Sequence, residues 1–203
     1  MKVFLATRNA KKLVELQRIL DAANLAVHVV GMSDVEQYAE SPETGLTFAE
    51  NALAKAVEGA EHTGLATVAD DSGLTVDVLG GMPGIFSARW CGHHGDDEAN
   101  LDLVLNQIKD LPDSVRAAAF VCAGALALPD GRTFVTEGRM RGHLVRERRG
   151  TNGFGYDPIF VPDGYSQTTA ELAPADKDAI SHRGQAFRAL AQIIAEILTP
   201  GED

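Results

Sequence analysis

Short apolar runs alternate with segments of helical periodicity through the first half of this chain. Val3 to Ala6 predicts a buried strand, and apolar residues then recur at helical spacing from Leu13 to Ala23. A second short strand is expected over Val27 to Gly31, and Val115 to Leu128 is the longest β-like run. Alternating strands and helices, followed by a run of strands, predict an α/β fold with a mixed sheet flanked by helices. We expect two lobes with a cleft between them.

The length and composition are those of one globular domain. The chain has 203 residues, of which 45% are hydrophobic and 23% charged, so we expect a single domain over residues 1–203 with a sizeable core. The apolar run at the N-terminus is too short for a secretory signal or a membrane span. We therefore expect a cytoplasmic protein with no membrane partner.

The charge balance argues against nucleic acid as a general partner. Eighteen Lys and Arg residues stand against twenty-nine Asp and Glu residues, which gives a formal net charge of −11. Such a surface repels a polyanion, although a small anion can still bind where cations gather locally.

Several catalytic and metal-binding patterns are missing from the sequence. The two cysteines, Cys91 and Cys122, form no C-x-x-C pair, and the apolar surroundings of Cys122 predict a buried structural thiol. The histidines show no zinc-binding spacing, and there is neither a Walker A loop nor a G-x-G-x-x-G motif.

The first candidate site lies between the first predicted strand and helix. Thr7-Arg8-Asn9 forms the loop, with Asn9 as the N-cap, and Lys11 and Lys12 lie in the first turn. A helix N-terminus binds anions, and a bound anion would offset the unfavourable placement of two lysines there. The alternative is a pair of surface lysines.

Asp70 and Asp71 form the second candidate site. They follow the β-prone run Ala66 to Ala69 and precede Ser72-Gly73, so we expect a strand that ends in two acids beside a glycine turn. Carboxylates in that position suit Mg²⁺, which takes its remaining ligands from water and substrate phosphates. The alternative is a solvated turn.

The sequence Thr47-Phe48-Ala49-Glu50 predicts a capping box that opens a helix through about Glu61. Phe48, Asn51, Ala52 and Lys55 share one face of that helix. Lys55 is therefore expected either to point at a ligand or to extend its ammonium to solvent.

Glycines and aromatic residues alternate in the loop over residues 151–158. Phe154 offers a stacking face for a planar ring, and the neighbouring glycines allow close approach of the backbone; a bulge before the next strand is the alternative. The segment from Lys177 to Leu198 is expected to be mostly helical, and Arg183 on its apolar stripe requires an acceptor.

Five separated motifs in this order resemble the Ham1/RdgB-like inosine triphosphate pyrophosphatases, also called noncanonical purine NTP pyrophosphatases. The matching segments are Ala6 to Asn9 with Lys12, Glu43 to Lys55, Ala69 to Trp90, Gly153 to Phe160, and Lys177 with Ile180 to Gly184. They extend over most of the chain, which makes the match far more specific than any single motif.

The resemblance implies a mixed α/β homodimer that hydrolyses ITP, dITP and XTP to the nucleoside monophosphate and pyrophosphate with Mg²⁺, and so cleanses the nucleotide pool. It implies Asp71 as the catalytic acid and metal ligand, Glu43 as the second metal carboxylate, and Asp70 as its near neighbour. The implied substrate-binding residues are Thr7, Arg8, Asn9, Ala10, Lys11, Lys12, Lys55, Ser72, Phe154, Gly155, Tyr156, Asp157, Lys177, His182 and Arg183.

Two positions depart from the family pattern, since Arg8 stands where a small residue, often glycine, is usual and Asn152 where glycine is frequent. Two other functions stay open at this point. One is a nucleotide-binding sensor that does not hydrolyse its ligand, and the other is a pyrophosphatase for other modified nucleotides.

Overall fold

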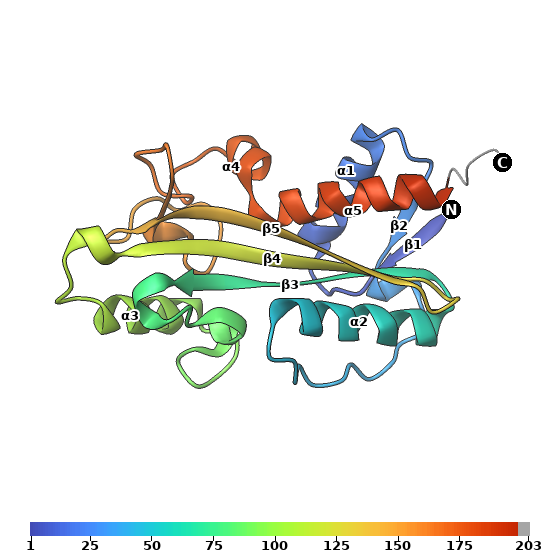
Figure 1. The fold of residues 1–203 in the computed structure, drawn as a ribbon, viewed down its shortest axis with the longest axis horizontal. Helices are drawn as coiled ribbons and strands as arrows, with labels where there is room; N and C mark the ends of the chain where they lie inside the picture. The colour runs from blue at the N-terminus through green and yellow to red at the C-terminus, as the bar shows by residue number, and fades with distance from the viewer. Residues whose placement is uncertain (199–203) are drawn as a thin grey trace. The chain divides into compact units, whose positions relative to one another are not determined.

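The computed structural model describes residues 1–198, which form helices and strands in mixed order (Figure 1). The helices and strands are β1 (Lys2–Leu5), α1 (Ala10–Ala22), β2 (His28–Val30), α2 (Phe48–Thr63), β3 (Ala66–Val76), α3 (Asp97–Gln107), β4 (Ala117–Ala127), β5 (Thr133–Leu144), β6 (Phe160–Pro162), α4 (Pro174–Ile180) and α5 (His182–Leu198). None of the helices within these residues is long and apolar enough to span a bilayer.

All six strands belong to one sheet with the order β2-β1-β3-β4-β5-β6. Strand β1 pairs in parallel with both β2 and β3, whereas β5 and β6 are antiparallel. The predicted α/β fold with a mixed sheet is therefore confirmed. The cleft between two lobes stays a prediction.

The chain divides into two compact units. Unit 1 contains residues 1–71, 122–138 and those from Arg183 onward, and unit 2 contains residues 72–121 and 139–182. Strands β3, β4 and β5 each contribute residues to both units.

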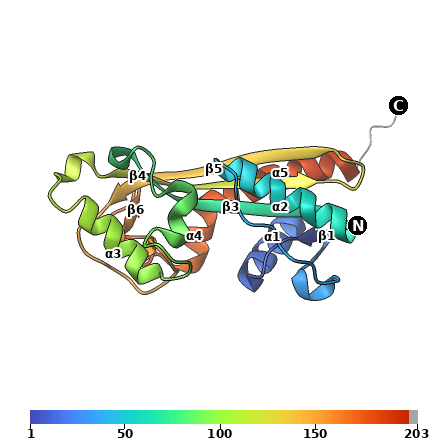
Figure 2. The ribbon, with the colours of Figure 1, turned by 90° about the horizontal axis from the view of Figure 1, so that it is seen from below.

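Unit 1 buries apolar side chains on both faces of its part of the sheet. On one face Leu16 of α1 and Phe187 of α5 pack with Leu126 of β4. On the other face alanines of α2 pack with Ala123 and Ala125 of the same strand. This alternation is that of a strand buried on both sides. Figure 1 shows α5 and α2 on opposite sides of the strands, and Figure 2 views the side that α2 covers.

Unit 2 has its own apolar core. Leu101 and Val104 of α3 pack with Phe120 of β4, Leu144 of β5 and Phe160 of β6. This core supports the loop over residues 151–158, because Tyr156 at its end is one of the buried members.

The prediction that the strand ends in Asp70 and Asp71 beside a glycine turn is wrong, and so is the alternative of a solvated turn. Strand β3 continues through both acids, Ser72 and Gly73 as far as Val76. The composition of this stretch is typical of a turn, but Ala69 on one side and Leu74 on the other are fully buried. Burial of these flanking side chains in the sheet overrides local turn preference. The two acids are therefore held by a rigid strand.

Two helix predictions are refined. Thr47 is the N-cap of α2, and its hydroxyl accepts from the Glu50 N–H, but the Glu50 carboxylate accepts from Leu46 rather than closing a capping box on Thr47. The segment over 177–198 is mostly helical, as expected, but is divided at Ser181, whose backbone is extended. Arg183 consequently lies in the first turn of a separate helix, α5.

Candidate functional site

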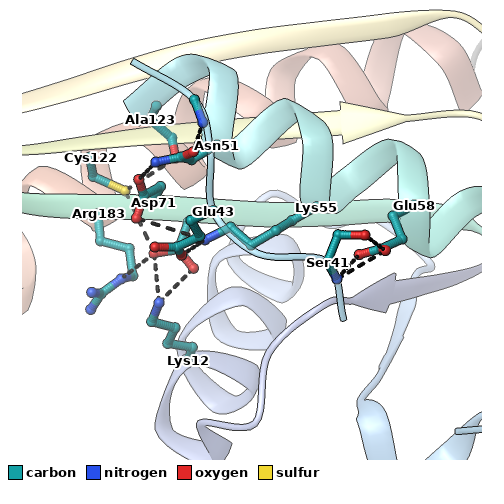
Figure 3. A network of polar contacts seen from close by, with 12 residues as sticks. Lys12, Ser41, Glu43, Asn51, Lys55, Glu58, Asp71, Cys122, Ala123 and Arg183 are labelled. Carbon is teal, nitrogen blue, oxygen red and sulfur yellow. Dashed lines mark hydrogen bonds and ion pairs between the residues drawn. The ribbon is translucent and has the colours of Figure 1, made fainter. Parts of the chain in front are cut away.

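Asp70 is the centre of a buried cluster of charges in unit 1, which we call the Asp70 cluster. Both carboxylate oxygens accept from Lys12 Nζ of α1 at 2.8 Å, and Oδ2 accepts from Arg183 Nε of α5 at 3.2 Å. Arg183 also lies 3.8 Å from the Glu15 carboxylate. The acceptor that the buried arginine requires is therefore supplied by Asp70 and Glu15. Figure 3 shows Lys12 and Arg183 extending toward strand β3 from below.

The charges of the Asp70 cluster compensate one another. The Asp70 side chain is 1% exposed, and burial alone would raise its pKa, but Lys12 and Arg183 outweigh that effect and hold the pKa below its ordinary value. The same carboxylate raises the pKa of Arg183 against the opposing effect of burial. Asp70 is thus ionised and holds two cations beside strand β3.

Asp71, Glu43, Lys55 and Asn51 form a second group, the Asp71 cluster (Figure 3). Lys55 Nζ lies 3.0 Å from Glu43 Oε1 and 3.7 Å from Asp71 Oδ1, so both carboxylates face one ammonium. Asn51 Nδ2 donates to Asp71 Oδ2 at 2.9 Å. Lys55 was expected either to point at a ligand or to extend its ammonium to solvent. In the structure its side chain is only partly exposed, and its ammonium is turned toward the two acids.

Asp71 differs from its neighbour in its electrostatics. Burial raises its pKa, and Lys55 and Asn51 only partly oppose that effect, while Glu43 and Asp70 add to it. Burial lowers the pKa of Lys55, but Asp71 and Glu43 together raise it above its ordinary value. A carboxylate whose proton is held more tightly than usual is one suited to accept a proton in a reaction.

The loop between β1 and α1 carries the residues expected to bind phosphate. Thr7 Oγ1 accepts from the Asn9 N–H at 3.2 Å, which shapes the turn that leads into α1. The side chain of Lys11 lies outside the described part of the structure. Ala10 is the first residue of α1, and it is exposed.

Arg8, one of the two departures from the family pattern, pairs with a carboxylate outside both clusters. Its Nε donates to Glu40 at 2.8 Å, and both side chains are largely exposed. This contact ties the loop to the segment that leads to Glu43.

In unit 2 the loop over residues 151–158 is held by a buried aspartate. Asp157 accepts from the Phe154 N–H at 2.9 Å and from the Thr169 hydroxyl at 2.8 Å, and it forms an ion pair with Lys177. Phe154 itself is 55% exposed, with Lys177 Nζ 5.7 Å from its ring centroid. The ring is therefore available for stacking, and Asp157 positions the loop that carries it.

Other predicted residues of unit 2 face its interior. The Tyr156 hydroxyl donates to the Ser87 carbonyl at 2.8 Å, and burial raises the pKa of this tyrosine. The His182 ring stacks on Phe120 with centroids 5.1 Å apart. Ser72 follows Asp71 in β3 and is partly exposed. Of the predicted residues in the loop, Phe154 and Gly155 offer the most accessible surface.

A pocket of about 260 Å³ lies beside this loop in unit 2. Its lining combines residues of the loop with Asp97, Leu101 and Arg148. Asp97 Oδ2 accepts from the Gly155 N–H at 2.9 Å, so the start of α3 fixes one wall. The second departure, Asn152, braces the same loop, because its Nδ2 donates to the Leu172 carbonyl at 3.1 Å.

Two residues of the site were not among those expected to act. Asn51 contacts Asp71 directly, and the Cys122 thiol lies 4.0 Å from Asp70 Oδ2. Asp70 was expected to suit Mg²⁺ together with Asp71, and the structure pairs it with Lys12 and Arg183. Cys122 is fully buried, and burial raises its pKa, so the predicted structural role is confirmed. The signal for Asn51 was its position four residues before Lys55, on the same helix face.

The donor set around Asp71 fits a hard divalent cation. Within residues 1–198 no group of three or more His, Cys, Asp or Glu side chains is arranged to hold a metal by itself. Glu43 and Asp71 nevertheless share a single cation, Lys55, and oxygen donors of this kind suit Mg²⁺, which also binds water and substrate phosphate.

Comparisons with known proteins identify the family of this chain. The Ham1 family model matches residues 3–193. A dITP/XTP pyrophosphatase of Mycobacteroides abscessus is 54% identical over 99% of this chain and 98% of its own length. One of Streptomyces coelicolor is 57% identical over 97% of this chain and 98% of its own length.

Solved structures give the same result. A crystal structure of a nucleoside-triphosphatase / dITP/XTP pyrophosphatase from Mycobacterium abscessus has a TM-score of 0.80 at 57% identity, and covers 96% of this chain and 99% of its own. The Ham1 protein of Staphylococcus aureus has a TM-score of 0.88 at 36% identity, with 97% and 100% of the two chains covered.

Proposed function

The chain belongs to the Ham1 family, and on that basis we propose that it hydrolyses noncanonical purine nucleoside triphosphates to the nucleoside monophosphate and pyrophosphate. The substrates are ITP, dITP and XTP. The observation that carries the proposal is the Asp71 cluster, in which two carboxylates face one lysine. It occurs in a chain that relatives named dITP/XTP pyrophosphatase match over nearly its whole length.

Asp71 and Glu43 would hold Mg²⁺. When bound there, the ion supplies neutralisation of phosphate charge and a lower pKa of nearby water. The partial exposure of Lys55, Glu43 and Asp71 supports this role, since a ligand can reach all three side chains.

Cations of the Asp70 cluster and of the loop before α1 bind the triphosphate. Lys12 is anchored by Asp70 and has 18% of its side chain exposed, so it can meet a phosphate without leaving its partner. Lys55 adds charge from α2, and Thr7, Arg8, Asn9, Ala10 and Lys11 surround the start of α1, where backbone N–H groups attract anions. Cleavage of a phosphoanhydride depends mainly on such positioning and charge stabilisation.

Asp71 is the catalytic residue. Its carboxylate orients the attacking water and accepts a proton from it. Asn51 donates to Oδ2 of Asp71, while Oδ1 of the same carboxylate faces Lys55.

The residues that bind the nucleoside are those that the resemblance to the family implies. Phe154 stacks on the base, while Ser72, Gly155, Tyr156, Asp157, Lys177 and His182 shape or support the site. A guanidinium carries five N–H donors, so Arg183 can contact Asp70 and also donate to the carbonyl at C6 of hypoxanthine or xanthine. Adenine has an amine at C6 and would leave that donor unsatisfied, which is the basis of discrimination.

We also propose that residues 1–203 act as a single pyrophosphatase domain, that the protein is cytoplasmic, and that it forms a homodimer. Gel filtration with light scattering tests the dimer. A mass of one chain at micromolar concentration would refute it.

The test of the proposed function is a product assay over ITP, dITP, XTP and the four common triphosphates. Each is incubated with and without Mg²⁺, and orthophosphate is measured before and after addition of inorganic pyrophosphatase. We expect orthophosphate to be detected only with ITP, dITP and XTP, only with Mg²⁺, and only after inorganic pyrophosphatase is added.

Other outcomes identify other functions. Orthophosphate before that addition would indicate cleavage at a different bond. Nucleotide binding without product would indicate a sensor. Preference for a pyrimidine or another modified base would indicate a pyrophosphatase that cleaves the same bond in a different nucleotide.

A further inference from the structure

Asn51 contacts one of the two carboxylates proposed to hold the metal and the backbone near the other. It belongs to α2 and is 2% exposed. Its Nδ2 donates to Asp71 Oδ2 at 2.9 Å, and its Oδ1 accepts from the Gly45 N–H at 2.8 Å. Figure 3 shows the side chain reaching toward Asp71 from α2.

The orientation of this amide is determined by its partners. A backbone N–H can only donate, so the atom that faces Gly45 must be the amide oxygen, and the NH₂ group must face Asp71. Rotation of the amide by half a turn would place two donors against each other at Gly45 and two acceptors at Asp71. Since Asn51 is buried, both mismatches would be costly. Asp71 Oδ2 is therefore held as an acceptor in one place.

The second contact connects Asn51 to the chain segment of Glu43. Gly45 follows Glu43 by two residues, and a Cβ added at Gly45 would lie only 2.6 Å from Asn51 Oδ1. The close approach of the backbone to the amide thus depends on glycine. One side chain consequently holds both Asp71 and the segment that carries Glu43.

Helix α2 holds this segment at two further points. The Ser41 hydroxyl donates to Glu58 Oε1 at 2.5 Å, and the Ser41 N–H contacts both oxygens of Glu58. Lys55 contacts Glu43 itself. Asn51, Lys55 and Glu58 are spaced four and three residues apart, so they lie on one face of α2 and hold residues on both sides of Glu43.

We propose that Asn51 is the positioning residue of the metal site: its amide sets the place of Asp71 relative to Glu43 and so determines the affinity for a divalent cation. This inference rests on the proposed function. Partners that orient metal ligands in this way typically change metal affinity or activity by about 10–100-fold when they are removed.

The experiment compares Asn51→Leu, whose side chain has the same number and branching of heavy atoms but cannot form hydrogen bonds, with Thr47→Ala. Thr47 caps the same helix without contacting either carboxylate, so its substitution lowers the melting temperature through α2 alone. Binding of Mn²⁺ to each protein without nucleotide is measured by the loss of the free-ion electron paramagnetic resonance signal. Values of kcat and KM for dITP are measured at saturating Mg²⁺ and over a Mg²⁺ titration.

We expect Asn51→Leu to bind Mn²⁺ at least about tenfold more weakly than the wild type, and to require correspondingly more Mg²⁺ for half-maximal rate, with KM for dITP little changed. Thr47→Ala should bind Mn²⁺ as the wild type does. A folded Asn51→Leu protein with wild-type Mn²⁺ affinity would overturn the inference. Equal losses in both variants would overturn it too, because they would indicate an effect of helix stability.

A measurement on the wild type covers the case in which Asn51→Leu does not fold. The side-chain amide resonances of Asn51 should shift when Mg²⁺ is added. If these resonances do not shift at a Mg²⁺ concentration that supports hydrolysis, the positioning role is refuted. Failure of the proposed function looks different, since the wild type would then release no pyrophosphate from dITP. A wild type that hydrolyses dITP but binds no Mn²⁺ would refute the inference alone.

Discussion

Substitution of Asp70 by Asn tests whether the buried carboxylate supports the structure of unit 1. Asp70→Asn keeps the size of the side chain but removes the charge that Lys12 and Arg183 share. The new amide offers one acceptor where the carboxylate oxygens accept three hydrogen bonds, and its NH₂ group would face a cation.

The expected loss follows from burial. Removing one partner of a buried ion pair costs about 3–5 kcal/mol, because the remaining charge is left uncompensated. Lys12 and Arg183 keep 18% and 12% of their side chains exposed, so water can partly solvate them. We therefore expect the lower end, about 3 kcal/mol, which for a chain of this size lowers the melting temperature by roughly 6–12 °C.

The matched control is Asp77→Asn. Asp77 also pairs with an arginine, Arg141, through contacts of 3.1 and 2.8 Å, but the two side chains are 48% and 43% exposed. An exposed pair contributes less than about 1 kcal/mol. Both variants are melted in buffer with EDTA, so that no divalent cation contributes.

The pH dependence gives a second measurement. Because the pKa of Asp70 is lowered by folding, its contribution to stability is complete above the unfolded pKa of about 3.9 and is lost as the pH falls through the folded pKa. The difference in stability between wild type and Asp70→Asn should be full near pH 7 and narrow below about pH 4. The reasoning would be refuted if Asp70→Asn lowered the free energy of unfolding no more than Asp77→Asn does. It would also be refuted if the difference in stability between wild type and Asp70→Asn did not change with pH.

Three further predictions concern catalysis, binding and packing. Asp71→Asn should reduce kcat for dITP by about 10²–10⁴-fold with an unchanged circular dichroism spectrum, because an amide oxygen there can still accept from Asn51; an active, folded variant would remove the catalytic assignment. Phe154→Ala should raise KM for ITP about tenfold, since stacking on a base contributes about 1–3 kcal/mol. The melting temperature should not change, because the ring is 55% exposed, and a KM equal to that of the wild type would contradict the stacking role. Gly73→Ala should lower the free energy of unfolding in urea by about 1–3 kcal/mol, because a Cβ would lie 2.3 Å from Ser87 Oγ and 2.6 Å from the Gly84 carbonyl oxygen. An unchanged urea midpoint would show that this part of unit 2 adjusts freely.

Local features of the sequence determined the elements of the fold. The period of the apolar residues indicated α1 and β1, the Thr47 cap marked the start of α2, and the apolar surroundings of Cys122 indicated a buried thiol. The resemblance to the Ham1 family also came from short motifs, and the family match over residues 3–193 confirms it. These signals succeed because caps and periodicity depend on residues within a few positions of one another.

Only the tertiary structure decided where the charges meet. Asp70 is 58 residues from Lys12 and 113 from Arg183 along the chain, and no local pattern pairs them. The same limit applies to the stretch from Asp70 to Gly73, whose composition favours a turn although burial of its neighbours keeps it in β3. Burial makes an unpaired charge costly, so the partner of a buried carboxylate is fixed by whatever the fold places beside it, not by its neighbours in sequence.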